Sequence, residues 1–198
     1  MKKKANGKYI RTIIAVTVMA ALCVGYFFYL SNKKPSVDAT DKAVNDKEVA
    51  ALTTRDILNN YPESPKEVVK FYARITKAYY KAELTDEQIE ALGKQARLLF
   101  DDELKGKQTE EEFLAALKAD IEDYNKISRY VSDYKIEESE EVQFKTFGER
   151  KYASLRVNYM LRDGSELRNS LTKYTLRQDS EGRWKILYWE LVSSTTGN

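Results

Sequence analysis

The stretch Ala153–Arg162, which reads ASLRVNYMLR, decides the fold because an apolar residue occupies every second position from Ala153 to Leu161. A period of two places alternate side chains on opposite faces of a β-strand, so this segment predicts a strand with one buried face. Asp163-Gly164 follows directly and predicts a hairpin turn. We therefore expect a second, antiparallel strand over about residues 166–178.

The length of the hairpin loop determines which residues face each other. A three-residue loop, 163–165, places Leu161 opposite Leu167 and keeps the apolar side chains together, whereas a two-residue loop places Leu161 opposite Glu166. We expect the three-residue loop, because a shift of one residue moves every side chain of a strand to the other face.

Two more strands complete the expected sheet. One should run from about residue 134 to 144, with a turn at 147–149, and the last from Arg183 to Leu191. The last strand has Trp184, Ile186 and Tyr188 on one face and Leu187, Trp189 and Leu191 on the other, so both of its faces are apolar.

Three amphipathic helices are expected before the strands, because three start signals each precede apolar residues at helical spacing. Ser64–Glu67 and Thr85–Gln88 have the pattern of a capping box, and Thr109–Glu112 opens the third helix. Helices followed by antiparallel strands predict an α+β fold, with three helices packed on a curved antiparallel meander sheet.

The segment from Thr12 to Leu30 predicts a transmembrane helix, because its 19 residues carry no charge. As a helix it would span roughly 28 Å, close to the thickness of the bilayer core. The run ends in bulky aromatic residues without a small-x-small cleavage site, so a retained signal-anchor is favoured over a cleaved signal peptide. Cys23 follows Leu22 in mid-span, which argues against a lipoprotein leader.

Charge predicts the orientation of this anchor. Five basic residues precede the span and two follow it closely, which favours a cytoplasmic N-terminus and an extracytoplasmic C-terminal domain in the cell membrane. The expected organisation is a cytoplasmic basic segment 1–11, a transmembrane anchor 12–30, a flexible linker 31–59, an α+β domain 60–192 and a tail 193–198.

Composition excludes several kinds of chemistry. The chain has no histidine, which removes the usual general base and metal ligand, and its only cysteine is Cys23 in the predicted span, so the exported part has no thiol nucleophile. Residues 35–198 carry 26 basic and 31 acidic side chains. We therefore expect no metal, no cofactor and no nucleic-acid partner.

The chain resembles the nuclear-transport-factor-2-like superfamily, whose fold is a cystatin-like α+β cone. The resemblance covers about residues 60–192 and rests on SPKEVVKFYARI at 64–75, the strand meander, and DSEGRWKILYWEL at 179–191. More narrowly, the anchor, NNYPESPKEVVKFYARI, LLFDDEL and LRQDSEGRWKILYWE resemble a family of small uncharacterised membrane-anchored proteins of Gram-positive bacteria. The superfamily includes isomerases, dehydratases and non-catalytic modules, and none of its catalytic residues can be matched to a position here.

These patterns predict a binding protein. Inward-facing tyrosines are candidate pocket residues, namely Tyr72, Tyr79, Tyr124 and Tyr159, and the last strand offers a candidate interface, namely Trp184, Tyr188 and Trp189. We expect a membrane-anchored extracytoplasmic module that binds a small ligand or a protein partner, or forms a homodimer through the sheet, without catalysis. The alternative is a small pocket enzyme that performs acid–base isomerisation or dehydration.

Overall fold

A computed structural model describes residues 39–81 and 83–192 of the chain. By its internal contacts the chain divides into two units, Met1–Asp41 and Lys42–Asn198, and the description below concerns the second. The basic segment 1–11, the predicted anchor from Thr12 to Leu30 and the tail 193–198 lie outside the described residues. Within the part that the structure describes, no helix has both the length and the apolar composition needed to cross a membrane.

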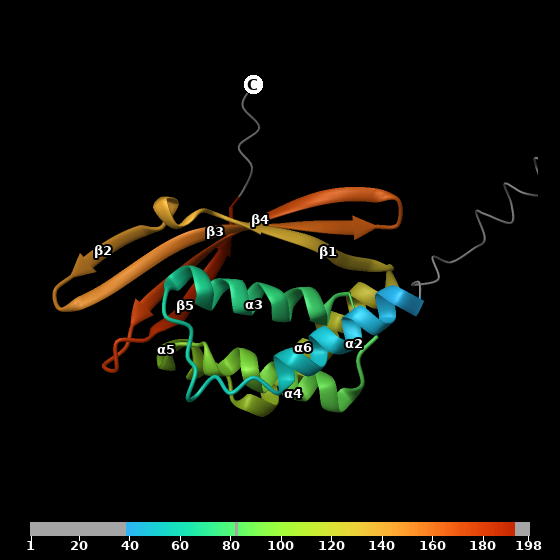
Figure 1. Cartoon of the computed structure of the whole chain (residues 1–198), viewed down its shortest axis with the longest axis horizontal. Coiled ribbons are helices and arrows are strands. Elements are labelled where there is room, and N and C mark those ends of the chain that lie inside the picture. Colours follow the sequence, from blue (N-terminus) through green and yellow to red (C-terminus); the bar gives the residue numbers. More distant parts are fainter. Residues whose placement is uncertain (1–38, 82, 193–198) are drawn as a thin grey trace, which may run out of the picture. The chain divides into compact units, whose positions relative to one another are not determined.

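Helices come first in the chain and strands follow, so the α+β prediction is confirmed (Figure 1). The described part contains five α-helices, two more than the sequence predicts: α2 (Ala39–Thr53), α3 (Pro65–Tyr79), α4 (Asp86–Leu98), α5 (Asp102–Lys105) and α6 (Glu110–Lys126). The strands are β1 (Arg129–Ile136), β2 (Gln143–Phe147), β3 (Arg150–Asp163), β4 (Glu166–Gln178) and β5 (Trp184–Leu191), with a 3-10 turn η1 (Ser139–Glu141) between β1 and β2.

The helices cover one face of a curved antiparallel sheet (Figure 1). The strand order is β1-β3-β4-β5, and β2 pairs with the start of β3 on the same side as β1. Helix α3 packs directly against the sheet, while α4 and α6 pack on each other. The single strand expected over 134–144 is therefore two strands that share β3 as their partner.

The helix starts follow the sequence signals, with one difference. Thr85 forms a reciprocal capping box with Gln88, as the sequence predicts, and Thr109, where the third helix was expected to open, forms one with Glu112. Ser64 caps α3 by accepting a hydrogen bond from the amide of Glu67. The prediction of a full box at α3 is wrong, because the Glu67 carboxylate accepts instead from Lys70, at 3.3 Å.

The predicted linker 31–59 is folded from residue 39 onward. Helix α2 occupies Ala39–Thr53, and Val49, Leu52 and Ile57 are almost fully buried in the hydrophobic core. Because these three apolar residues are few and separated by small and charged ones, they form no sustained stripe in the sequence. The compact unit therefore begins well before residue 60.

The β3–β4 hairpin differs from both registers considered above. Asp163 pairs with Glu166, so the loop consists of Gly164 and Ser165. Gly164 has a φ of 61°, as the first loop position of a type II′ turn requires. This register places Leu167 on the outer face of the sheet, where 55% of its surface is exposed.

A β-bulge in the last strand pair separates the side chains of β5 into two sets. Leu176 pairs with Ile186 and Thr175 with Tyr188, so Leu187 has no partner in the ladder. Side chains after the bulge therefore lie on the opposite face from the one expected relative to those before it, and Trp189 joins Ile186 on the inner face. The edge of β5 is covered because Ile186 exchanges backbone hydrogen bonds with Leu99 and Asp101, both 2.8 Å long.

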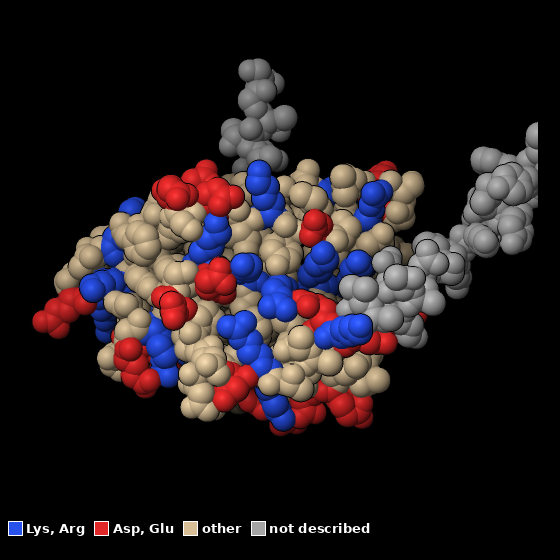
Figure 2. Space-filling model, viewed as in Figure 1, with Lys and Arg blue, Asp and Glu red and all other residues tan. Residues whose placement is uncertain are grey.

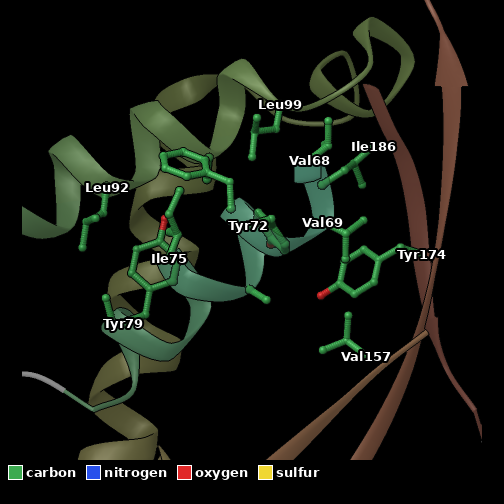
Figure 3. Close-up of a cluster of buried hydrophobic side chains, with 14 of the residues drawn as sticks. Val68, Val69, Tyr72, Ile75, Tyr79, Leu92, Leu99, Val157, Tyr174 and Ile186 are labelled. Atoms are coloured by element: carbon green, nitrogen blue, oxygen red, sulfur yellow. The ribbon is translucent and has the colours of Figure 1, made fainter. Parts of the chain in front are cut away.

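The hydrophobic core lies between α3 and the sheet (Figure 3). Val68, Val69 and Ile75 of α3 are fully buried there. Tyr174 points from β4 toward the helix, and its ring meets that of Tyr72 edge-on at 5.8 Å between centroids. The rings of Tyr72 and Tyr174 therefore form part of the core, at the side where it borders the cavity described below.

Candidate functional site

An open cavity of about 520 Å³ lies between α3, α6 and the inner face of the sheet. The structure brings all four candidate pocket tyrosines together along it: Tyr72 and Tyr79 from α3, Tyr124 from α6 and Tyr159 from β3. Tyr72, Tyr79 and Tyr159 are buried, whereas Tyr124 is half-buried. A concave space with apolar walls and a few polar groups is the usual form of a small-molecule site.

The deep wall of the cavity presents neutral phenols. The hydroxyl groups of Tyr159 and Tyr174 are hydrogen-bonded at 2.7 Å. Burial raises the pKa of Tyr159 to about 12, and burial also raises the pKa of Tyr174. Burial also raises the pKa of Tyr79, whose hydroxyl is buried without a hydrogen-bond partner. At neutral pH these groups are therefore protonated, so this wall carries no charge.

A carboxylate lies at the rim of the cavity. Asp120 is exposed on α6 and accepts a hydrogen bond from the hydroxyl of Tyr80. The Tyr80 ring packs on the Tyr124 ring, with 4.2 Å between their centroids. Burial, followed by the bond to Asp120, raises the pKa of Tyr80. The rim therefore combines two stacked phenol rings with one negative charge.

The residues of the candidate interface lie in three different places. Trp184 is buried, with 9% of its surface exposed, so it does not form part of an open surface. Trp189 lines the cavity with 40% exposed, and its ring lies 5.6 Å from that of Tyr72. Tyr188 is on the outer face of the sheet with 42% exposed. The bulge at Leu187 places Tyr188 on the face opposite Trp184 and brings Trp189 onto the same face as Trp184.

The outer face of the sheet carries a shallower groove of about 340 Å³. Three aromatic side chains, Phe147, Tyr152 and Tyr188, line it together with Lys145 and Lys173. Lys173 forms an ion pair with Glu190 at 3.4 Å. Basic and acidic side chains are interspersed on the face that Figure 2 shows, so that face presents no large patch of one sign.

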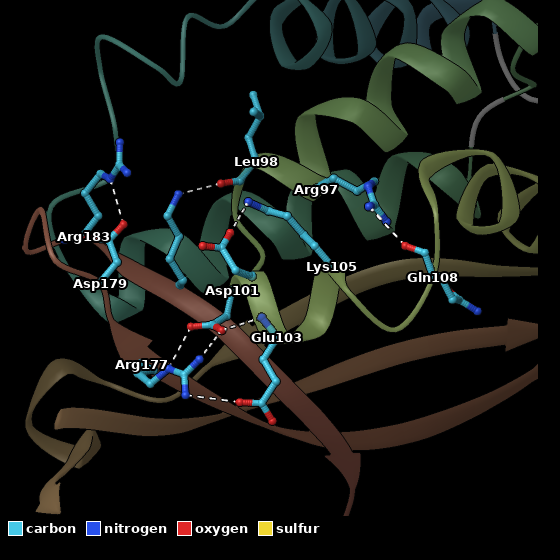
Figure 4. A network of polar contacts seen from close by, with 11 residues as sticks. Arg97, Leu98, Asp101, Glu103, Lys105, Gln108, Arg177, Asp179 and Arg183 are labelled. Carbon is cyan, nitrogen blue, oxygen red and sulfur yellow. Dashed lines mark hydrogen bonds and ion pairs between the residues drawn. The ribbon is translucent and has the colours of Figure 1, made fainter. Parts of the chain in front are cut away.

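Hydrogen bonds and ion pairs fix the segment between α4 and α6 against the sheet. Arg177 of β4 donates to the buried carboxylate of Asp101 through two nitrogen atoms and to Glu103 at 3.2 Å (Figure 4). Asp101 also caps α5, accepting from the amide of Glu103 at 2.9 Å. Nearby, Lys185 donates to the carbonyl of Leu98 at 2.8 Å. These contacts hold in place the chain that leads into α6, one wall of the cavity.

Metal chemistry has no visible site in this part of the chain. Among residues 39–81 and 83–192, no three His, Cys, Asp or Glu side chains gather in a way that could hold a metal ion. The polar groups among the described residues that line the cavity are phenols, threonine and serine hydroxyls, the amide of Gln108, the indole of Trp189 and the carboxylate of Asp120.

Asp120, Tyr174 and Tyr80 are among the cavity-lining residues that the sequence did not predict. Asp120 lies four residues before Tyr124 on one face of α6, so the helical spacing could have revealed it. Tyr174 faces outward in the favoured three-residue-loop register, where it would pair with Ser154, but in the observed register it pairs with Leu155 and faces inward. Tyr80 follows the last residue of α3 and lies off its apolar stripe, so no periodic signal pointed to it.

Fold and site together define an α+β protein in which a helical layer and a curved sheet enclose an open, tyrosine-lined cavity. The chain belongs to the family described as Domain of unknown function (DUF6715), which matches residues 1–189. A comparison with the curated proteins finds no match.

Proposed function

We propose that this protein is a membrane-anchored, extracytoplasmic module that binds a small ligand in its cavity without catalysis. In this proposal Thr12 to Leu30 forms the anchor and the compact unit lies outside the cell membrane, as the uncharged span and the charge bias around it favour. We also infer a nuclear-transport-factor-2-like cone, supported by the long helix α3 lying against a curved antiparallel sheet.

The open cavity is the observation that carries the proposal. A chain of this size could fill the space between helix and sheet with side chains, as it does around Val68 and Ile75. Between α3, α6 and β4, however, about 520 Å³ remains open and is bordered by hydroxyl groups. Apolar walls with a few orienting polar groups favour a ligand that is mostly apolar.

The alternative, acid–base isomerisation or dehydration, would have to use Asp120 and Tyr80. A catalytic carboxyl that works near neutral pH is usually shielded from water, because burial brings its pKa toward the working pH. Asp120 is exposed on α6, and it is the one carboxylate among the described residues that line the cavity. The geometry therefore favours binding over catalysis.

A protein partner on the outer face is a second candidate, supported by exposed apolar residues there. Leu167, Leu171 and Tyr188 are 55%, 36% and 42% exposed. The side chains between them are charged or polar, and the groove beside them is smaller than the cavity. We therefore rank this surface, including a homodimer through the sheet, below the cavity.

Blocking the cavity tests the proposal. Ala116 lines the cavity and its neighbour Ala115 does not, although both are exposed on α6. Ala116→Phe should abolish the binding of small aromatic probes such as phenol and indole, measured by equilibrium dialysis, while Ala115→Phe should bind them like the parent protein. Absence of binding to the parent protein, or equal binding by both variants, would overturn the proposal.

The predicted location needs its own test. Intact cells producing the chain with a C-terminal epitope should lose that epitope when protease is added outside, and the full-length chain should fractionate with the membrane. Recovery of the chain in the cytosol, or of a shortened chain in the medium, would contradict the anchored location.

A further inference from the structure

We propose that the cavity selects an organic cation that carries an apolar body, such as a quaternary ammonium compound with an aromatic or alkyl group. This inference rests on the proposed function and names the chemical class of its ligand. Three observations support it: the aromatic walls, the sign of the charge at the rim, and the absence of a basic side chain among the lining residues that the structure describes.

Aromatic rings form a large part of the wall. Eight of them line the cavity from three sides: Tyr72, Tyr79, Tyr80, Phe113, Tyr124, Tyr159, Tyr174 and Trp189. The face of such a ring is negative, so a cation near the ring centroid is attracted by about 0.5–2 kcal/mol, more when it is shielded from water. A box of rings binds quaternary ammonium groups well because these groups cannot form hydrogen bonds and are weakly hydrated.

Asp120 provides the only formal charge among the described lining residues. It is placed beside the stacked rings of Tyr80 and Tyr124, where it can attract the positive end of a ligand. The phenols deeper in the cavity are neutral at physiological pH, so they neither repel an apolar body nor hold an anion by charge.

Two arginines approach the outside of these rings without lining the cavity. Arg129 lies 5.7 Å from the Tyr124 centroid, and its charge is paired with Asp163 at 2.7 Å. Arg97 lies 5.4 Å from the Phe113 centroid and donates to the carbonyl of Gln108. Both contacts place a cation beside a ring of this wall, and the carboxylate of Asp163 offsets the charge of Arg129.

A matched pair of probes separates charge from shape. Phenyltrimethylammonium and tert-butylbenzene have nearly the same size and shape, and only the first is charged. Equilibrium dialysis of the full-length protein should show the cation binding about tenfold more tightly, as expected when ring and carboxylate attraction together exceed the cost of desolvation by roughly 1.4 kcal/mol. Asp120→Asn should reduce the affinity for the cation several-fold and leave that for tert-butylbenzene unchanged.

The outcomes distinguish this inference from the function on which it rests. Equal binding of both probes, each lost in Ala116→Phe, would overturn the preference for a cation and leave the ligand-binding cavity standing. Tighter binding of benzenesulfonate than of phenyltrimethylammonium would overturn the inference in the same way. Failure of all three probes to bind would contradict both the cation preference and the proposed function.

Discussion

The hydroxyl group of Tyr79 is buried without a hydrogen-bond partner, whereas that of Tyr159 is bonded to Tyr174 at 2.7 Å. A buried polar group that lacks a partner destabilises a protein by about 1–3 kcal/mol. Tyr79 and Tyr159 line the same cavity, so they can be compared directly: the hydroxyl of Tyr159 has a hydrogen-bond partner and that of Tyr79 has none.

Replacing each of these tyrosines by phenylalanine should therefore change stability in opposite directions. Tyr79→Phe should raise the free energy of unfolding by about 1 kcal/mol, because it removes an unsatisfied group. Tyr159→Phe should lower it by about 1–2 kcal/mol, because it leaves the Tyr174 hydroxyl without a partner. Urea denaturation followed by circular dichroism measures both; a loss of stability in Tyr79→Phe would show that its hydroxyl has a partner in solution.

The sequence identified the tyrosines that line the cavity, including Tyr124 at the rim, but not the rim carboxylate of Asp120 or the hydroxyl of Tyr80. Tyr72, Tyr79 and Tyr124 could be placed inward because each lies on a helical stripe. Asp120 was overlooked because a charged residue beside an apolar stripe normally faces water, as it also does here. The Asp120 carboxylate becomes part of the site because it accepts a hydrogen bond from Tyr80, which lies forty residues away in the sequence.

Helix α2 is the element whose role the sequence predicted least well. Leu52 is fully buried in the core, whereas Leu58, in the same predicted linker, is 69% exposed. Leu52→Ala should lower the free energy of unfolding by about 2–5 kcal/mol, the usual effect of leaving a cavity in a core. Leu58→Ala should change it by less than about 0.5 kcal/mol, as surface substitutions do. Equal effects in urea denaturation would mean that α2 does not pack on the unit in solution.

The ion pair between Arg177 of β4 and Asp101, just before α5, can be tested in the same way. Asp101 is buried and paired with Arg177, while Glu103 reaches the same arginine from the surface, with 62% of its side chain exposed. Asp101→Asn should lower the free energy of unfolding by about 3 kcal/mol, because it leaves a poorly exposed guanidinium without its partner. Glu103→Gln should cost at most about 1 kcal/mol. Thermal unfolding that ranks the two variants in the opposite order would contradict this assignment.

Two local backbone features explain why the strands could be predicted but not their pairing. The alternation in β3 predicts a strand and its buried face, but it does not determine how many residues the hairpin loop contains. Gly164 favours a two-residue loop because it adopts a positive φ without strain, and Leu167 and Leu171 of β4 lie on the outer face as a result. The bulge at Leu187 is a tertiary feature, set where the edge of β5 meets Leu99–Asp101.

For the molecule as a whole, buried titratable groups predict a maximum of stability at alkaline pH. Burial, with help from Arg183, lowers the pKa of Lys185 to about 8. Between about pH 8 and 10 the unfolded chain holds a proton on this lysine that the folded protein has released, so stability should rise with pH. Above about pH 10 the unfolded tyrosines ionise, whereas Tyr72, Tyr79 and Tyr174 stay protonated because burial raises their pKa, so stability should fall.

Melting temperatures measured from pH 7 to 11 test this profile. Lys185→Met should remove the rise between about pH 8 and 10 and keep the fall above it, since the variant lacks the titrating amine but retains the buried phenols. A parent protein whose stability decreases steadily from pH 8 would contradict the lowered pKa of Lys185.

The central claim is that a ligand enters the space between α3, α6 and the sheet, and locating a bound probe tests it most directly. Phenyltrimethylammonium should be added to full-length protein with labelled aromatic residues, and its contacts mapped by intermolecular nuclear Overhauser effects. We predict contacts to the rings of Tyr124 and Trp189, which border the cavity. Contacts confined to Phe147, Tyr152 and Tyr188 on the outer face would contradict the claim.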